Sequence, residues 1–170
     1  MKQGTISVLF GCHSPVHSVI VIVAWRKLYG KLPNYWETSC ILLHDIGHWG
    51  TNYLDNIEEK KQHGVLGSRV AGKLFGQKGY DLCAGHNPYI GIPRSKLYEP
   101  DKYSWCIAPL SWIWLTTFFE PKLIWKGCTR WQSAVNFRQS MRKNQETGFK
   151  ELAHDIYLKR CKEEQVGDKK

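Results

Sequence analysis

Apolar and polar residues along the 170-residue chain recur mainly at helical spacing. Ser14 and Pro15 suit a helix start, because serine can cap free backbone N–H groups and proline is tolerated in the first turn. This helix is predicted to run to about Tyr29 and to end at Gly30. The residues before it, 1–12, show only a weak alternation and are predicted to be extended or irregular.

Two further helices are predicted in the first half of the chain. Asn34 followed by Glu37 resembles a capping box, and the helix that it opens is expected to finish near His48. An amphipathic helix is predicted between Ile57 and Gly76, because its apolar residues recur every four positions: Leu66, Val70 and Leu74, with Gly67 and Ala71 beside them.

The second half also shows helical signals. We expect a short helix over 80–86, a helix that starts at Pro100, and an apolar helix over 110–119 ended by Pro121. Two more helices would be capped by Thr129 and Thr147. No strand pattern competes, so the predicted fold class is all-α. We expect a single domain over 1–161 and a charged, flexible tail over 162–170.

Composition and charge narrow the class of protein only slightly. The formal charge of +9 favours anionic partners, although a solvated basic surface explains it equally well, and nucleic acid is possible but not favoured. The apolar runs are shorter than the ~20 residues that span a bilayer, so no membrane partner is expected. The six cysteines include no C-x-x-C pair, which predicts reduced thiols in a cytoplasmic protein. The aromatic-rich stretch 105–131 is expected to pack in the core, with base stacking, pocket closure or a homo-oligomer interface as alternatives.

Candidate metal ligands are spread through the first two thirds of the chain, each on or beside a separate predicted helix. A helical bundle lined with inward histidines and carboxylates can hold one or two cations. The candidates, in chain order, are His17, His44, Asp45, His63, His86 and Asp101.

This order, H…HD…H…H…D, resembles the HD-domain superfamily of metal-dependent phosphohydrolases over about residues 13–105. The resemblance implies an HD-like helical bundle with one or two divalent transition metal ions in its core, with Fe, Mn, Co or Ni favoured by the mixed N and O donors. It implies that one ion is held by His17, His44, Asp45 and Asp101. His63 and His86 match members that hold a second ion, which the aspartate of the pair bridges.

Two further residues enter through the same resemblance. The form H-D-I-G-H is similar to the motif of deoxynucleotide triphosphohydrolases, which makes His48 a candidate phosphate contact or acid. Lys102 follows Asp101, as a lysine often does in the family, and is a second candidate catalytic residue. The sequence departs from these relatives at residues 49–52, where Trp-Gly-Thr-Asn replaces Pro-Phe-x-His, and the Gly-Tyr-Pro signature of cyclic-dinucleotide phosphodiesterases does not follow His86.

The function predicted from these residues is metal-dependent hydrolysis of a phosphate ester or anhydride in a nucleotide or small phosphorylated metabolite. Two cations bridged by Asp45 would lower the pKa of a water molecule, and the resulting hydroxide would attack phosphorus. The alternatives are a mixed-valent di-iron oxygenase, a cyclic-nucleotide phosphodiesterase and a non-catalytic nucleotide-binding module. His13 competes with His17 as first ligand, and His17 is preferred because His13 lies before the predicted helix.

Overall fold

In the computed structural model, residues 1–52, 56–87 and 91–143 are described, and they form helices joined by short connections, without a strand. The elements in order are α1 (Gln3–Phe10), α2 (Pro15–Tyr29), α3 (Tyr35–Leu43), the 3-10 turn η1 (Ile46–His48), α4 (Ile57–Phe75), α5 (Gln77–Ala84), α6 (Tyr98–Ile107), α7 (Leu110–Phe119) and the 3-10 turn η3 (Pro121–Leu123). A further helical segment covers residues 130–143. The predicted all-α class is therefore confirmed for the described part of the chain.

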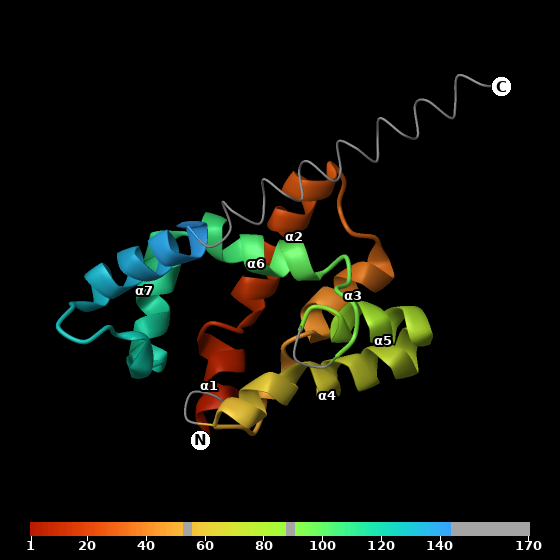
Figure 1. Ribbon diagram of the computed structural model, residues 1–170, viewed down its shortest axis with the longest axis horizontal. Coiled ribbons are helices and arrows are strands. Elements are labelled where there is room, and N and C mark those ends of the chain that lie inside the picture. The colour runs from red at the N-terminus through yellow and green to blue at the C-terminus, as the bar shows by residue number, and fades with distance from the viewer. Residues whose placement is uncertain (53–55, 88–90, 144–170) are drawn as a thin grey trace.

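Helices α2 and α6 pack against each other in the middle of the molecule (Figure 1). The helices α3, α4 and α5 pack together on one side of this pair, while α7 and the segment 130–143 lie on the other side. Helix α1 contacts both η1 and α7, so it lies along the edge between the two halves. The middle of the fold is thus enclosed by elements from both halves of the chain.

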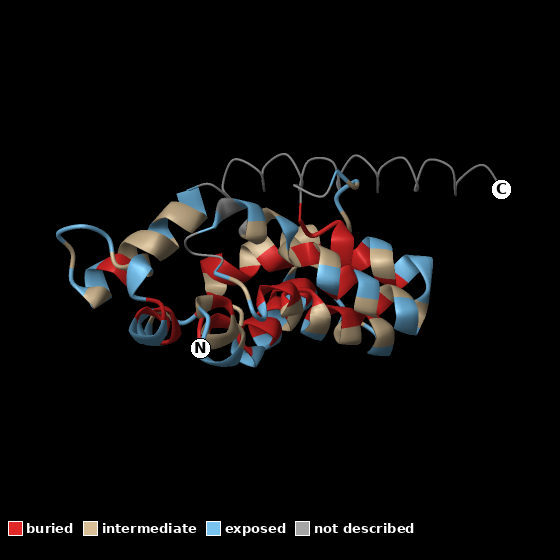
Figure 2. Ribbon diagram, turned by 90° about the horizontal axis from the view of Figure 1, so that it is seen from below, coloured by how far each residue is buried: buried red, intermediate tan, exposed pale blue. Residues whose placement is uncertain are grey.

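Two apolar cores meet at α2. One contains Val21 and Trp25 of α2 together with Cys40, Ile41, Ala71, Leu82, Cys83 and Leu97. The other contains Ile20 of α2 together with Cys12, Trp105, Ala108, Trp112, Ile113 and Ala134. In Figure 2 the buried residues line the faces that the helices turn toward one another. Since α2 contributes to both cores, the middle of this helix is packed between them.

The prediction of an extended N-terminal segment was wrong, because residues Gln3–Phe10 form α1. Gly4 and Ser7 are the buried residues of this helix, and their three-residue spacing puts them on one face. The Gly4 N–H donates to the Thr51 carbonyl at 2.9 Å, and a Cβ on Gly4 would lie 1.9 Å from the His48 carbonyl oxygen. Close packing on the segment 48–51 therefore decides the conformation, which the weak alternation in the sequence did not reveal.

Helix α3 begins as predicted but ends earlier. The capping box is present: the Glu37 N–H donates to Asn34 Oδ1 at 3.0 Å, and the Asn34 N–H donates to Glu37 Oε2 at 2.9 Å. The helix stops at Leu43 rather than near His48, and the chain continues through a turn into η1.

The buried face of α4 differs from the predicted apolar stripe. Leu66 is 46% exposed and Leu74 is 62% exposed, so the stripe faces solvent at both positions. The buried positions hold small residues instead: Gly64, Gly67, Ser68 and Ala71. A Cβ on Gly67 would lie 2.5 Å from the Leu43 carbonyl oxygen, so α4 approaches the end of α3 too closely for leucine side chains.

The remaining elements follow the predictions with small shifts. Helix α5 occupies Gln77–Ala84 rather than 80–86, and α6 starts two residues before Pro100. Helix α7 covers the predicted range, and the Gln132 N–H donates to Thr129 Oγ1 at 3.2 Å, as a cap would require. Thr147, Cys161 and the tail 162–170 lie outside the described residues.

The cysteines in the described ranges are free thiols: Cys12, Cys40, Cys83, Cys106 and Cys128. Within the same ranges, no single helix combines the length and the apolar character needed to cross a membrane.

Candidate metal centre

The six predicted ligands converge at the centre of the fold from five separate elements. His17 lies in the first turn of α2, and its ring stacks on Trp105 of α6 with 4.8 Å between ring centroids. His63 lies on α4 and Asp101 on α6. His44 and Asp45 follow directly after α3, and His86 follows α5. All six are buried except His63, whose side chain is 16% exposed.

The rings of two histidines, His44 and His86, are oriented by the same kind of hydrogen bond. His44 is the first residue after α3, and its ring Nδ1 donates to the Ile41 carbonyl at 2.6 Å. His86 lies two residues after α5, and its Nδ1 contacts the Cys83 carbonyl in the same way. The last carbonyls of a helix have no intrahelical partner, so each ring uses one as its acceptor. A histidine with Nδ1–H bonded to a carbonyl presents Nε2 as its ligand atom, which is the arrangement usual at metal sites.

The Asp45 carboxylate lies between two groups of nitrogen atoms. Its Oδ2 is 3.1 Å from His44 Nε2 and 3.4 Å from His17 Nε2. Its Oδ1 is 3.6 Å from His63 Nε2 and 3.7 Å from His86 Nε2. Each carboxylate oxygen of Asp45 therefore faces a different pair of histidines.

Asp101 completes the first of these groups. Its Oδ1 is 3.1 Å from His17 Nε2 and 3.7 Å from His44 Nε2. In the second group, the Nε2 atoms of His63 and His86 lie 3.0 Å apart. Two ligand atoms that are each about 2.1 Å from one ion lie about 3–3.5 Å from each other. The separations in both groups, 3.0–3.7 Å, lie within this range or slightly above it, so both groups suit donors that surround a shared cation.

Unsatisfied buried atoms support the same conclusion. His44 Nε2 and Asp45 Oδ2 are buried, and neither makes a hydrogen bond of acceptable geometry within the described part of the chain. Buried polar atoms normally have a partner, so each such atom in a folded protein calls for an explanation. These buried histidine and aspartate groups could hold a metal ion. The mixed imidazole and carboxylate donors suit Fe, Mn, Co or Ni, as well as zinc.

The electrostatic environment keeps the carboxylates ionised. Burial alone would raise the pKa of Asp45, but His44 and His13 hold it well below its usual range. Burial would also raise the pKa of Asp101, and the Lys102 ammonium with the neighbouring histidines holds it well below its usual range. Both side chains are therefore anionic at neutral pH, as cation ligands must be.

The histidines in and beside the centre differ in their protonation. Burial lowers the pKa of His86 and of His13 to about 3, so both rings are neutral near pH 7. Burial would lower the pKa of His44 as well, but Asp45 and Asp101 raise it to about 10. A cation that binds at His44 has to displace a proton, because only the neutral ring is a ligand.

The two candidate catalytic residues occupy different positions. The Lys102 ammonium lies 2.8 Å from Asp101 Oδ2, and the Lys102 side chain is 33% exposed. Lys102 therefore contacts both the centre and the solvent. Burial would lower the pKa of Lys102, but Asp101 raises it, which keeps the ammonium charged. His48 is buried in η1 and stacks on His63 with 4.2 Å between ring centroids. Burial, His13 and His63 together lower the pKa of His48 well below its usual range.

The sequence pattern did not predict that His13 lies beside the centre together with His17. The preferred first ligand, His17, lies among Asp45 and Asp101, whereas His13 lies in the connection before α2, as expected. Yet the His13 ring is 4.0 Å from the His48 ring, measured between centroids. The four-residue spacing of His13 and His17 is a sequence signal that the two rings could lie on the same side. Only the turn between α1 and α2 shows that both rings face the centre.

Comparison with known proteins adds no relative, because no family model, curated protein or solved structure matches this chain. The geometry of the chain's own residues is therefore the basis for assigning a function.

Proposed function

We propose that this protein is a metal-dependent phosphohydrolase that cleaves a phosphate ester or anhydride of a nucleotide or small phosphorylated metabolite. The observation that supports the proposal most strongly is the position of Asp45, whose two oxygens face two separate groups of donors. A carboxylate between two such groups is suited to bridging a pair of cations. The order of the six residues, which resembles that of the HD-domain superfamily, favours the same chemistry.

In this proposal the six ligands are divided between two cations. His17, His44 and Asp101 would hold one cation, and His63 and His86 would hold another, with Asp45 between them. When bound, a pair of divalent cations lowers the pKa of a water molecule and neutralises charge on phosphoryl oxygens. The backbone carbonyls of Ile41 and Cys83 keep two of the rings in the ligating orientation.

Lys102 and His48 lie outside the set of six ligands, and both would act where the substrate binds. The Lys102 ammonium, 2.8 Å from Asp101 and partly exposed, is placed to attract a phosphoryl oxygen that approaches the centre. The His48 ring packs on the His63 ring, so it borders the second group of donors. His48 is then a candidate for contact with the phosphate, directly or through a cation that it binds, or for proton transfer.

The test is a hydrolysis assay on purified protein loaded with Mn²⁺ or Co²⁺, using a panel of nucleotides and small phosphorylated metabolites. We expect phosphate release from at least one class, and Asp45→Asn should reduce it to background because both groups of donors lose their shared carboxylate. Asp81→Asn is the matched control, since Asp81 is an exposed carboxylate on α5 outside the centre.

Two results would contradict the proposal. One is the absence of phosphate release with every metal and substrate, and the other is full activity in Asp45→Asn. Oxygen consumption by the iron-loaded protein in place of phosphate release would instead favour the di-iron oxygenase. Tight nucleotide binding without turnover in any metal would favour the binding module.

A further inference from the structure

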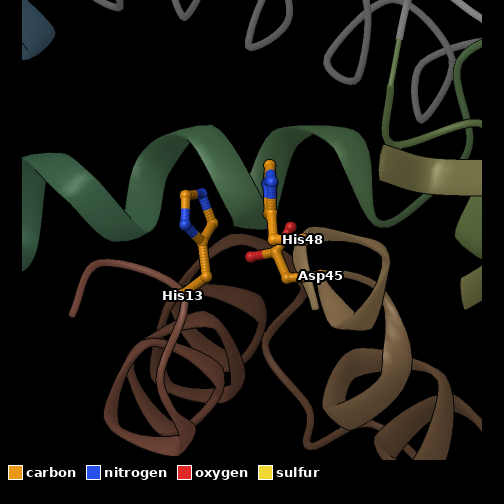
Figure 3. Close-up of side chains that lie close together, drawn as sticks. All are labelled: His13, Asp45 and His48. Atoms are coloured by element: carbon orange, nitrogen blue, oxygen red, sulfur yellow. The ribbon is translucent and has the colours of Figure 1, made fainter. Parts of the chain in front are cut away.

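A third group of possible ligands lies beside the six-residue centre. It consists of His13, Asp45 and His48, with one ligand atom from each residue within 4.8 Å of the others. Figure 3 shows the His13 and His48 rings side by side, projecting to the same side of the chain next to the Asp45 carboxylate. His13 comes from the connection before α2, and the other two residues come from the segment after α3. Only Asp45 is shared with the ligand groups described above.

Helix α1 holds this group together. Ser7 Oγ lies 2.7 Å from His13 Nδ1, and the His13 N–H donates to the Ser7 carbonyl at 3.3 Å. A ring whose Nδ1 contacts a neighbouring group ligates through Nε2, so this contact suits His13 as a ligand. The absence of a Cβ at Gly4 lets α1 pack directly on the His48 backbone. The helix therefore fixes His13 relative to His48, although it contains none of the six ligands.

We propose that His13 and His48, together with the Asp45 carboxylate, bind a third divalent cation beside the pair. Two imidazole nitrogens and one carboxylate oxygen form a donor set for the same borderline metals that suit the pair, such as Mn²⁺ or Co²⁺. Water and substrate oxygens would complete the coordination, since three protein ligands leave positions open.

The balance of charge at the centre indicates under which conditions the third cation binds. Three divalent cations bring more positive charge than the two carboxylates of the centre, Asp45 and Asp101, can balance. An oxyanion would supply the missing negative charge, so the third cation should bind most tightly with phosphate present. This coupling to phosphate rests on the proposed function, whereas the ligand set rests on the geometry alone.

The experiment measures metal content per chain by elemental analysis after equilibrium dialysis against Mn²⁺ and inorganic phosphate. We expect three equivalents in the wild type, two in His13→Ala and two in His63→Ala. The double variant His13→Ala/His63→Ala should retain one equivalent, because in this proposal His13 and His63 bind different ions. His48→Ala should match His13→Ala, and thermal unfolding followed by circular dichroism checks that each variant is folded.

Two results would overturn the inference. A wild type that binds only two equivalents under these conditions has no third site. A double variant that matches His63→Ala would place His13 on the second ion of the pair. The result that contradicts the proposed function is different. A wild type that binds three equivalents but hydrolyses no substrate would support the third site and contradict the proposed function. A wild type that hydrolyses a substrate but binds only two equivalents would support the proposed function and contradict the third site.

Discussion

At the scale of single residues, the orientation of the imidazole rings is what makes the centre suitable for cations. His44 and His86 each follow the end of a short helix, and each uses Nδ1 to bond a carbonyl three residues earlier. The bond satisfies a helix-end acceptor and directs Nε2 toward Asp45 at the same time. A ligand just beyond a helix end is therefore held by the helix without being part of it.

Lys102 provides the prediction at this scale. Lys102→Met should keep its metal content but lose roughly 10²-fold in the rate of phosphate release, because a preorganised cation near the reacting phosphate is removed. Elemental analysis and the hydrolysis assay measure the two effects separately. Lys78→Met, which removes an exposed lysine that lies over the Trp36 ring, is the control. Loss of metal from Lys102→Met would show instead that the lysine supports Asp101 as a ligand.

At the scale of elements, glycines set the distances between the segments that contain the ligands. A Cβ on Gly47 would lie 1.6 Å from the His63 carbonyl oxygen, so η1 rests directly on the α4 backbone. A Cβ on Gly67 would lie 2.5 Å from the Leu43 carbonyl oxygen and 2.8 Å from that of His44. These backbone contacts place the His44-Asp45 turn beside His63, which explains why small residues occupy the buried face of α4.

The corresponding prediction concerns Gly67→Ala. The added methyl group meets backbone atoms that cannot rotate away, so we expect a loss of about 1–3 kcal/mol in unfolding free energy and weaker metal binding. Gly72→Ala lies on the same helix, where the nearest atom would be Tyr80 Cβ at 3.2 Å, and it gains helix propensity. We expect its stability to stay within about 1 kcal/mol of the wild type. Urea unfolding measures both variants, and equal stabilities would contradict this account.

At the scale of the whole molecule, the centre connects segments that are far apart in the chain. Its ligands extend from His17 to Asp101, a separation of 84 residues, and they come from α2, α4, α6 and the ends of α3 and α5. Bound cations would therefore crosslink both cores of the protein. Any ligand that binds only the folded state stabilises it by mass action.

Metal removal should then lower the melting temperature. Free metal at a thousand times its dissociation constant contributes about 4 kcal/mol, which corresponds to roughly 10 °C for a chain of this size. We expect dialysis against a chelator to produce this decrease, and added Mn²⁺ to reverse it. In Asp45→Asn the melting temperature should be insensitive to metal. Identical thermal unfolding of the chelated and metal-loaded wild type would contradict the presence of the centre.

The sequence by itself indicated most of the helices and the set of candidate ligands. The Asn34 and Glu37 cap, Pro15 and the apolar stretch 110–119 act within one or two turns, so the neighbouring residues are sufficient to predict their effect. The order of histidines and aspartates likewise indicated the six residues that converge in the structure.

Only the tertiary structure decided how those residues meet. The helical state of residues Gln3–Phe10, the buried face of α4 and the early end of α3 all depend on backbone contacts between segments distant in sequence. The same contacts decide which Asp45 oxygen faces which histidines and bring His13 next to His48. A local pattern contains no information about such distances, because they are set by how closely two helices can approach and not by the residues of either helix alone.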